Sequence, residues 1–382
     1  MSTLFIKWFV TNMKINFLRN SIVLSLVVSG FILSSGAAEA FDSYCFPIEN
    51  GERYTCSFIA TEPQFVKPKA VQDEFVLTQK YGRLADFTNV YRKPSRDSEV
   101  VRNVGDGFLY VTTQGQFQDE AGEWWYMINF GEYVHKDDLK IADQSTFRGV
   151  EVTRQPTRPF GWVVVRNFTP STAPGLDPDE RFAEMLRYDF IEVYDAVLAE
   201  DGWLWYNIGD GRWINQQTVS LVDVDARPEG VGENDFWTEI DLYEQTLSAY
   251  EGDQLVFATL ISTGLNRWPT YEGLFQVDAE NRFQETKMGG AEGKVDYYYV
   301  EDVPHTMYFD LQNEIALHGA YWHDRFGYKH SHGCVNMPVQ DSEWVFNWSA
   351  DRDQEDFFVY VWESNPSQYF ERYDPEDPFV GA

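Results

Sequence analysis

The sequence predicts a mainly β protein, with two small β units followed by a larger β-rich domain. Short runs of β-branched and aromatic residues recur between turn residues, for example at 108–111 and 124–128, and such runs are typical of strands. One aromatic pattern returns after 80 residues, as expected when a small unit is duplicated. Helical periodicity is weak and is confined to a short segment at about 340–348.

The composition of the chain excludes some classes of protein. The 382 residues include 29 Phe, 22 Tyr and 13 Trp, and 43% are hydrophobic. The chain can therefore build packed cores and is long enough for two or three domains. Acidic residues outnumber basic ones by 61 to 30, which gives a formal net charge of −31. Because proteins that bind phosphate backbones need clustered Lys and Arg, we expect no nucleic acid partner.

The amino terminus has the features of an export signal. Residues 1–20 carry basic side chains and no acid, an apolar run of about 14 residues follows, and Ala38-Glu39-Ala40 fits a signal-peptidase site. The apolar run is shorter than the roughly 20 residues needed to cross a bilayer, and no second such run occurs. We therefore predict a signal peptide over 1–40 and export to the periplasm or cell wall, without a further membrane span. The alternative is an uncleaved amino-terminal anchor.

Export gives the three cysteines different meanings. Cys45 and Cys56 lie eleven positions apart in the polar, turn-rich segment 41–80. In an oxidising compartment they can form a disulfide, and a loop that short gains roughly 3 kcal/mol in the chain-entropy model. The alternative is two free thiols. Cys334 is left over, and an odd thiol in an exported protein is either a liability or a reagent.

The two small β units are predicted at 81–145 and 155–224. Trp125-Tyr126 followed by Gly131-Glu132-Tyr133-Val134 returns as Trp205-Tyr206 followed by Gly211-Arg212-Trp213-Ile214. A strand with an aromatic pair, a tight turn and a final aromatic strand resembles the bacterial SH3-like modules of secreted cell-wall proteins. The resemblance implies two small barrels that attach to wall or glycan. The alternative is that these aromatic side chains only fill two small barrel cores.

A linker and a larger domain follow the repeat. Residues 225–235 are rich in Pro, Gly and acidic residues, a composition typical of a linker. The domain predicted at 236–364 begins with a strand of period-two alternation at 238–242, and a buried strand follows at 255–260. Residues 365–382 form an acidic, Pro-containing tail.

The chemistry of the chain is concentrated in one histidine-rich stretch. Four of the six histidines fall within 15 residues, next to the isolated Cys334. A nucleophilic thiol needs a nearby base or cation, and donors for the oxyanion that it creates. Imidazole can supply the first, and the backbone amides of Gly333 and Cys334 can supply the second. The alternative is a zinc site with His330, His332 and Cys334 as ligands.

Two motifs in the third domain occur in a fixed order. Ser262-Thr263-Gly264 is followed by Pro269-Thr270 and Gly273-Leu274-Phe275, and later His318-Gly319 precedes Ser331-His332-Gly333-Cys334-Val335-Asn336. Together they resemble the catalytic domain of the L,D-transpeptidases of the YkuD type, with Tyr271 where that family usually has proline. The resemblance covers about residues 236–364 and implies an L,D-transpeptidase-type β-rich catalytic domain.

The resemblance also implies which residues react. Cys334 is expected to be the acyl-accepting nucleophile. His318 is expected to be the proton acceptor and donor, with its tautomer fixed by the carbonyl of Gly319. The alternative is that His332 is the base.

The other residues of the signature have supporting roles by the same resemblance. Gly333 supplies an oxyanion amide, Ser331 and His332 shape and polarise the site, and Asn336 supports the loop or contacts the substrate. Three aromatic residues are expected to line the substrate groove, with core packing as the alternative: Tyr308, Tyr321 and Trp322. The remaining histidines are expected at the surface or rim (His323, His330) or in ordinary structural positions (His135, His305).

These inferences predict an exported peptidoglycan L,D-transpeptidase that uses neither a metal nor an organic cofactor. Its donor is expected to be a stem peptide that ends in a D-amino acid, and its acceptor an amine of a neighbouring stem or of a protein. The alternatives are an L,D-carboxypeptidase or L,D-endopeptidase of the same fold. A further alternative is a non-catalytic wall-binding protein that uses the SH3-like pair.

Overall fold

The computed structural model describes residues 64–67, 80–289, 298–350 and 357–364 in full, and residues 41–48 and 53–60 by their backbone. The predicted signal peptide and acidic tail lie outside the described residues. The chain is mainly β, as the sequence predicted. In the described part, α2 (Val339–Ala350) is the one α-helix, and it lies where the sequence predicted a helix.

The elements follow one another in groups along the chain. The amino-terminal strands are β1 (Phe41–Ile48), β2 (Arg53–Ala60) and β3 (Phe65–Val66). The first unit contains β4 (Lys80–Leu84), β5 (Asn89–Tyr91), β6 (Val100–Asn103), β7 (Phe108–Thr113), β8 (Gly115–Gln118), β9 (Trp124–Asn129), β10 (Glu132–His135), the 3-10 helix η1 (Lys136–Asp138) and β11 (Leu139–Ile141). After β12 (Val150–Val152), the second unit contains β13 (Phe160–Val163), β14 (Asn167–Phe168), β15 (Met185–Leu186), β16 (Phe190–Glu192), β17 (Asp195–Leu198), β18 (Leu204–Asn207), β19 (Trp213–Asn215), η2 (Gln216–Thr218) and β20 (Val219–Val222). The carboxy-terminal domain contains β21 (Phe236–Asp241), β22 (Thr246–Glu251), β23 (Gln254–Leu260), β24 (Gly273–Val277), η3 (Ala279–Asn281), β25 (Arg282–Gly289), β26 (Tyr298–Asp310), β27 (Ile315–Gly319), β28 (Val335–Met337), α2 and β29 (Phe357–Trp362).

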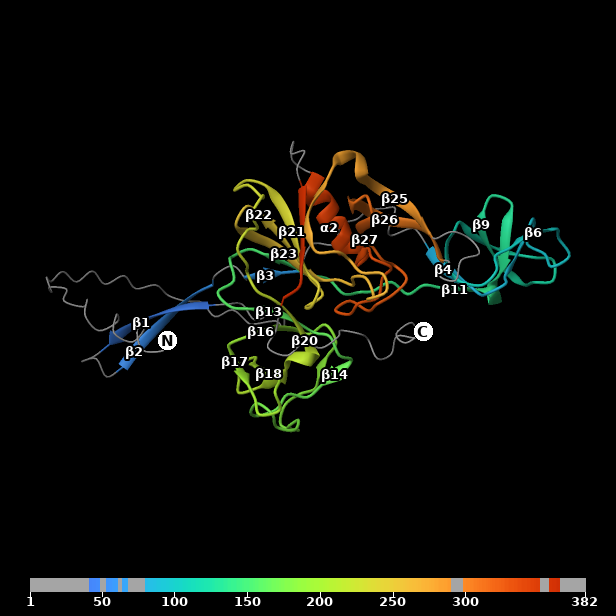
Figure 1. The fold of residues 1–382 in the computed structure, drawn as a ribbon. Helices are drawn as coiled ribbons and strands as arrows, with labels where there is room; N and C mark the ends of the chain where they lie inside the picture. Colours follow the sequence, from blue (N-terminus) through green and yellow to red (C-terminus); the bar gives the residue numbers. More distant parts are fainter. Residues whose placement is uncertain are drawn as a thin grey trace. The chain divides into compact units, whose positions relative to one another are not determined.

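Two seven-stranded sheets organise the carboxy-terminal domain. The first has the strand order β24-β29-β21-β22-β23-β12-β3. The second has the order β11-β4-β7-β26-β27-β28, and β25 pairs with β26 outside this path. Figure 1 shows α2 alongside β26 and β27, and the helix contacts both strands.

The core of this domain draws apolar side chains from both sheets and from α2. Single strands contribute residues two apart, such as Met307 and Phe309 of β26, because alternate side chains of a strand point to the same face. Val345 of α2 belongs to the same buried cluster. Since a fully buried side chain of this size contributes about 1.5–3 kcal/mol, this core fixes the positions of β26, β27 and β28.

The first unit is joined to the carboxy-terminal domain by a continuous sheet. β7 pairs with β26 in parallel, with Phe108 opposite Tyr298 and Tyr110 opposite Val300. The Tyr81 ring stacks on the Tyr321 ring with centroids 3.6 Å apart. The unit is therefore part of the framework of the domain. Local sequence patterns indicate strands but not which distant strands pair, so this junction could not be predicted.

The 80-residue repeat is visible as repeated structure. Trp125 Nε1 donates to Asp119 Oδ2 at 3.0 Å, and Trp205 Nε1 donates to Asp201 Oδ2 at 2.9 Å. In each unit a 3-10 helix, η1 or η2, precedes the last strand. The strand pairings of the described residues do not trace a closed barrel in either unit, so the SH3-like identity stays a prediction.

The segments around the two units also enter the sheets. β12, which lies between the predicted units, pairs with β23, and β3 pairs with β12. Near the amino terminus, β1 and β2 form an antiparallel pair in which Cys45 lies opposite Cys56. Directly opposite positions bring Cα atoms within the range that a disulfide spans. The disulfide stays a prediction, because the backbone alone is described here.

The described residues contain no helix that is both long enough and apolar enough to cross a membrane. The predicted signal peptide is not among them.

Two buried carboxyl groups lie in the framework of the domain. Glu239 on β21 accepts from the Tyr250 hydroxyl at 3.0 Å, and burial together with the nearby Asp225 raises its pKa to about 8. Asp341 on α2 accepts from the Thr259 hydroxyl and from the Gly149 amide, and burial raises its pKa to about 7.

These shifts predict how stability depends on pH. The pKa of the Glu239 carboxyl is higher in the folded than in the unfolded state. Its contribution to the free energy of unfolding is therefore fully present below about pH 4.5 and is lost as the pH rises to about 8. Glu239→Gln removes this contribution. The free energy of unfolding of the parent protein should therefore fall relative to that of Glu239→Gln by about 2–4 kcal/mol between these pH values. Urea unfolding at a series of pH values measures the difference. The exposed Glu99→Gln is the control, and parallel curves for parent and Glu239→Gln would contradict the prediction.

Candidate active site

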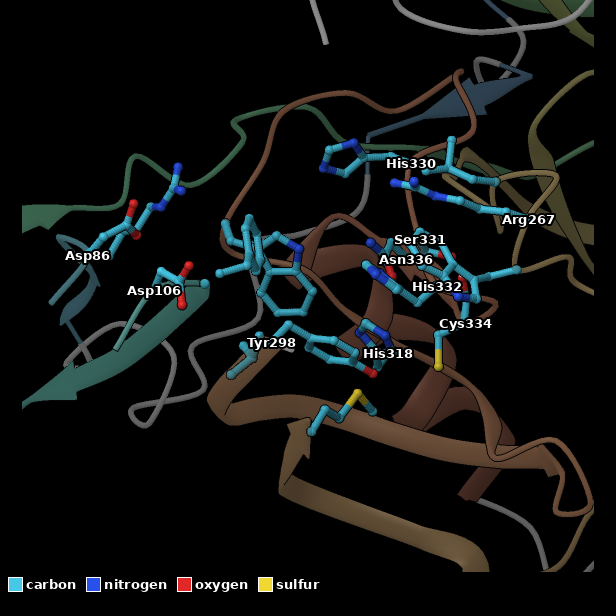
Figure 2. A pocket seen from close by; sticks show the side chains of 18 residues that line it. Asp86, Asp106, Arg267, Tyr298, His318, His330, Ser331, His332, Cys334 and Asn336 are labelled. Atoms are coloured by element: carbon cyan, nitrogen blue, oxygen red, sulfur yellow. The ribbon is translucent and has the colours of Figure 1, made fainter. Parts of the chain in front are cut away.

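The motif residues meet at a cavity of about 510 Å³, shown in Figure 2. Six predicted residues line it: His318, Trp322, Ser331, His332, Cys334 and Asn336. Residues of the first unit line it too, among them Arg83, Asp86 and Asp106. These three residues have no local signal in the sequence, because the first unit reaches the cavity through the pairing of β7 with the distant β26.

His318 is presented as a neutral base. It lies on β27 with only 2% of its surface exposed, and its Nδ1 is 3.0 Å from the carbonyl oxygen of Gly319. Since a carbonyl only accepts, Nδ1 carries the proton and Nε2 keeps its lone pair. Burial lowers the pKa of the ring to about 4. At neutral pH the ring is therefore uncharged and can accept a proton at Nε2.

Cys334 is positioned by the pairing of β27 with β28. The two strands are parallel, with His318 opposite Asn336, so the residue two positions before Asn336 shares the face that carries His318. That residue is Cys334, which ends the loop before β28. Figure 2 shows its sulfur and the His318 ring close together at the same side of the cavity.

The thiol is held in its neutral form. Cys334 is half-buried, and desolvation raises the pKa of its thiol to about 11, although the Ala316 amide favours the thiolate. The sulfur lies 3.8 Å from the Glu314 carbonyl oxygen, to which the thiol can donate. The resting site thus contains a neutral imidazole and a neutral thiol.

The segment that carries Ser262-Thr263-Gly264 holds the cysteine loop in place. Ser262 and Asn336 exchange two backbone hydrogen bonds of 2.9 Å, and the Leu265 amide donates to the Ser331 carbonyl at 3.0 Å. A Cβ at Gly264 would collide with the Trp268 carbonyl oxygen. Glycine is therefore required where the two segments approach each other.

Gly333 and Ser331 set the turn that presents the sulfur. Gly333 has φ of +119°, a conformation that side chains disfavour. Its amide donates to Ser331 Oγ at 3.1 Å, and that hydroxyl donates to the Cys334 carbonyl at 2.5 Å. The Gly333 amide, expected to stabilise an oxyanion, is thus engaged by Ser331 in this state.

His332 has its ring against aromatic surfaces. It is exposed at the cavity, with its ring centroid 3.9 Å from that of Trp268 and 4.8 Å from that of Tyr298. The guanidinium of Arg267 lies over the Trp268 ring, 4.0 Å from its centroid. Neither Trp268 nor Arg267 was singled out from the sequence, although both lie between the two pieces of the upstream motif.

The histidine cluster does not assemble as a metal site. The described residues contain no group of three His, Cys, Asp or Glu side chains that could hold a metal. The His330 ring packs against His323 with centroids 4.4 Å apart, whereas His332 packs against Trp268. In the described part of the chain, His330, His332 and Cys334 are therefore not grouped as the ligands of a zinc ion.

His323 supports the site from behind, and the expectation of a rim position is wrong. The residue is 6% exposed, its Nδ1 lies 3.2 Å from the Arg325 amide nitrogen, and its Nε2 lies 2.9 Å from the Asn336 side-chain amide. The atom of Asn336 in this contact is Nδ2, which donates to Nε2 in the tautomer that leaves Nε2 unprotonated. His323 thereby orients Asn336.

The three aromatic residues that were expected to line the substrate groove lie in three different environments. Trp322 lines the cavity, with its ring 5.6 Å from that of His318. Tyr308 is half-buried outside the cavity lining, and its pKa is raised by burial and by the charge of an ionised Cys334. The expectation for Tyr321 is wrong. Its side chain is fully buried, stacks on Tyr81 and donates to the Glu301 carbonyl.

The second unit and Ser145, which precedes it, hold the loop between His318 and Cys334. Tyr188 donates to Asp324 Oδ1 at 2.9 Å, and Ser145 donates to the same oxygen at 2.5 Å. The Arg187 guanidinium lies 5.4 Å from the Tyr328 ring centroid. Contacts from outside the carboxy-terminal domain thus fix the loop that carries His323.

Thr270 offers a test of how the cysteine loop is held. Its hydroxyl donates to the Gly333 carbonyl at 2.7 Å and accepts from the Gly264 amide at 3.0 Å. Thr270→Val leaves both buried backbone groups without this partner and should cost about 1–3 kcal/mol of unfolding free energy. We also expect acylation of Cys334 to slow about tenfold or more, because a misplaced nucleophile reacts poorly. Thermal unfolding and acylation by a carbapenem measure the two effects.

The control is Thr270→Ser, which keeps the hydroxyl and should retain most of both properties. Equal losses in the Ser and Val variants would contradict a role for the hydroxyl.

The fold and the site together define a β-rich domain with a Cys–His pair suited to acyl transfer. The model of the L,D-transpeptidase catalytic domain family, YkuD, matches residues 235–361. These residues are an L,D-transpeptidase catalytic domain of the YkuD family.

Individual relatives were also found. The Bacillus subtilis (strain 168) protein named "Putative L,D-transpeptidase YciB" is 27% identical over 117 residues, which cover 29% of this chain and 59% of the relative. A crystal structure of the Enterococcus faecium L,D-transpeptidase C442S mutant is 24% identical over 34% of this chain and 50% of that chain, with a TM-score of 0.29. An L,D-transpeptidase from Mycobacterium smegmatis is 16% identical over 58% of this chain and 93% of that chain, with a TM-score of 0.30.

Proposed function

We propose that this protein is an exported peptidoglycan L,D-transpeptidase that transfers an acyl group through Cys334. The observation that carries the proposal is the neutral His318, oriented by Gly319, on the same sheet face as Cys334 at a cavity. The catalytic domain family supports a cell-wall substrate and hence export. The donor is a stem peptide that ends in a D-amino acid.

The first half-reaction releases the terminal D-amino acid. The sulfur of Cys334 attacks the carbonyl at the L-centre of the diamino acid while His318 Nε2 takes the thiol proton. Backbone amides at the cysteine turn stabilise the oxyanion, and the Gly333 amide joins them when Ser331 releases it. His318 then gives its proton to the leaving amine, and a thioester remains.

The second half-reaction resolves the thioester. An acceptor amine attacks the thioester carbonyl, His318 removes a proton from the amine, and the departing thiolate takes that proton back. The products are a new amide and the free thiol. An amine of a neighbouring stem gives a crosslink, and an amine of a protein gives protein attachment. Water in place of the amine gives L,D-carboxypeptidase activity.

The products formed from stem peptides test this proposal. The mature protein, incubated with purified tetrapeptide muropeptides, should give crosslinked dimers detected by mass spectrometry. Cys334→Ala should give none, because no thioester can form. Tripeptide products alone would indicate the carboxypeptidase. If tetrapeptides do not react and pre-formed L,D-crosslinks are cleaved, the protein is an endopeptidase, whereas binding to cell walls without any reaction would favour the wall-binding alternative.

The pH dependence of acylation tests the roles of the two histidines. Because His318 loses its proton near pH 4 and the thiol loses its proton near pH 11, the rate of acylation by a carbapenem should be flat from about pH 5 to about pH 10. His318→Ala should remove the plateau and leave a rate that rises about tenfold per pH unit, because only thiolate then reacts. Stopped-flow absorbance measures these rates.

His332→Ala is the matched comparison, and it should keep the plateau. A plateau that survives in His318→Ala but disappears in His332→Ala would assign the base to His332.

A further inference from the structure

The orientation of one peptide group in the cysteine turn is not fixed by the residue that carries it. The Gly333 amide, which the proposed reaction uses for the oxyanion, belongs to the peptide that joins His332 to Gly333. Gly333 has φ of +119° and no side chain that limits its rotation. The direction of this amide therefore depends on how the neighbouring residues are held.

Hydrogen bonds hold the turn on both sides of Gly333, but one of them must open. Thr270 donates to the Gly333 carbonyl at 2.7 Å and so fixes the peptide between Gly333 and Cys334. The peptide before it is held by Ser331, whose Oγ accepts from the Gly333 amide at 3.1 Å. That second bond breaks when the amide turns to an oxyanion. A restraint on His332 that survives this step would keep the turn in place.

The side chain of His332 has such a restraint in two aromatic rings. Its ring centroid lies 3.9 Å from that of Trp268 and 4.8 Å from that of Tyr298, and each pair of ring planes is tilted by 31°. His332 is exposed to solvent at the cavity, yet its ring contacts rings from two other segments of the domain. Figure 2 shows His332 on the same side of the cavity as Cys334.

Trp268 is itself held in place by its backbone and by a cation. Its amide donates to the Leu265 carbonyl at 2.8 Å, and its carbonyl oxygen lies where a Cβ of Gly264 would collide with it. The following Pro269 disfavours helical backbone conformations at Trp268. The Arg267 guanidinium lies 4.0 Å from the Trp268 ring centroid, a cation–π contact that restrains the ring.

Trp268 and Thr270 belong to one short segment that runs along the turn. Trp268 contacts His332, and Thr270 binds the carbonyl of Gly333. Between them, the Pro269 carbonyl oxygen lies 3.7 Å from the position of a Cβ on Gly333. The segment 268–270 thus contacts successive residues of the turn that precede the nucleophile.

We propose that Trp268 is a positioning residue for the acyl transfer, which acts by anchoring His332 and hence the peptide that carries the Gly333 amide. The proposal rests on the proposed function, because it concerns the oxyanion of the same reaction. When Ser331 releases the amide, the anchored His332 allows one peptide to rotate without rearrangement of the turn. A donor that needs little reorganisation stabilises an oxyanion better than one that must be ordered during the reaction.

Acylation of Cys334 by a carbapenem, measured on the full mature chain at a series of carbapenem concentrations, tests this role. Trp268→Ala should lower the maximal rate of acylation about tenfold or more, because a misplaced donor fails in the transition state. The concentration that gives half of the maximal rate should change less than about twofold. Trp268→Phe keeps a ring against His332 and should restore most of the rate.

The matched control is Trp124→Ala, which truncates a tryptophan of the first unit that is 46% exposed and does not line the cavity. It should leave the rate unchanged. Thermal unfolding and the final fraction of labelled Cys334 check that each variant is folded and active. A higher half-saturating concentration with an unchanged maximal rate would make Trp268 a wall of the cavity and overturn the positioning role. Equal losses of rate in the Phe and Ala variants would overturn it too.

A double variant tests whether Trp268 acts through His332. His332→Ala should slow acylation about as much as Trp268→Ala does, and adding Trp268→Ala to it should change the rate less than about twofold. The flat pH dependence expected for His332→Ala is kept, at a lower rate. Effects that multiply in the double variant would show independent roles and contradict the proposal.

A spectroscopic measurement detects the contact independently of the reaction. Protons above an aromatic ring are shielded, so the His332 ring protons of the parent chain should be shifted upfield in NMR spectra of histidine-labelled protein. Trp268→Ala should lose most of this shift, and Trp268→Phe should keep part of it. If the parent chain is acylated but shows no such shift, the function stands and the positioning role falls. If the shift is present but the parent chain is not acylated, the proposed function fails, and with it any role of Trp268 in that reaction.

Discussion

The parallel pairing of β27 with β28 determines the geometry of the whole site. With His318 opposite Asn336, the proposed base and the loop that carries the thiol share one face of one sheet. The pairing in turn depends on the apolar core beneath it and on the backbone bonds between Ser262 and Asn336. The His323 ring then fixes the amide of Asn336 from behind. A reactive pair that depends on strand register is as rigid as the sheet itself.

Burial gives this pair its chemical character. Desolvation lowers the pKa of His318 and raises that of Cys334, so both changes favour uncharged groups. Such a site stores no thiolate–imidazolium pair in its resting state, and the proton moves only when an acyl carbonyl is present. A low thiolate population also limits side reactions of the thiol with oxidants.

The sequence predicted the residues of the site better than their surroundings. The signature from His318 to Asn336 could be recognised because its glycines and polar residues have backbone roles that leave a local pattern. Tyr321 was misassigned because an aromatic side chain beside the motif has the same pattern whether it faces a groove or stacks on Tyr81. His323 was misassigned because its partner, Asn336, is adjacent only after β27 and β28 pair. The contribution of the first unit could not be predicted, since pairing between β7 and β26 depends on strands almost 200 residues apart.

The junction between β7 and β26 also affects where the protein can be divided. The match to the catalytic family begins at 235, yet β26 uses β7 as a neighbour and β23 uses β12. A fragment cut at that boundary would expose unpaired strand edges in both sheets, and such edges promote pairing with other chains. The sheets of the catalytic domain therefore extend beyond the residues that match the family. Insertions and deletions between the first unit and β26 must preserve the register of a shared sheet.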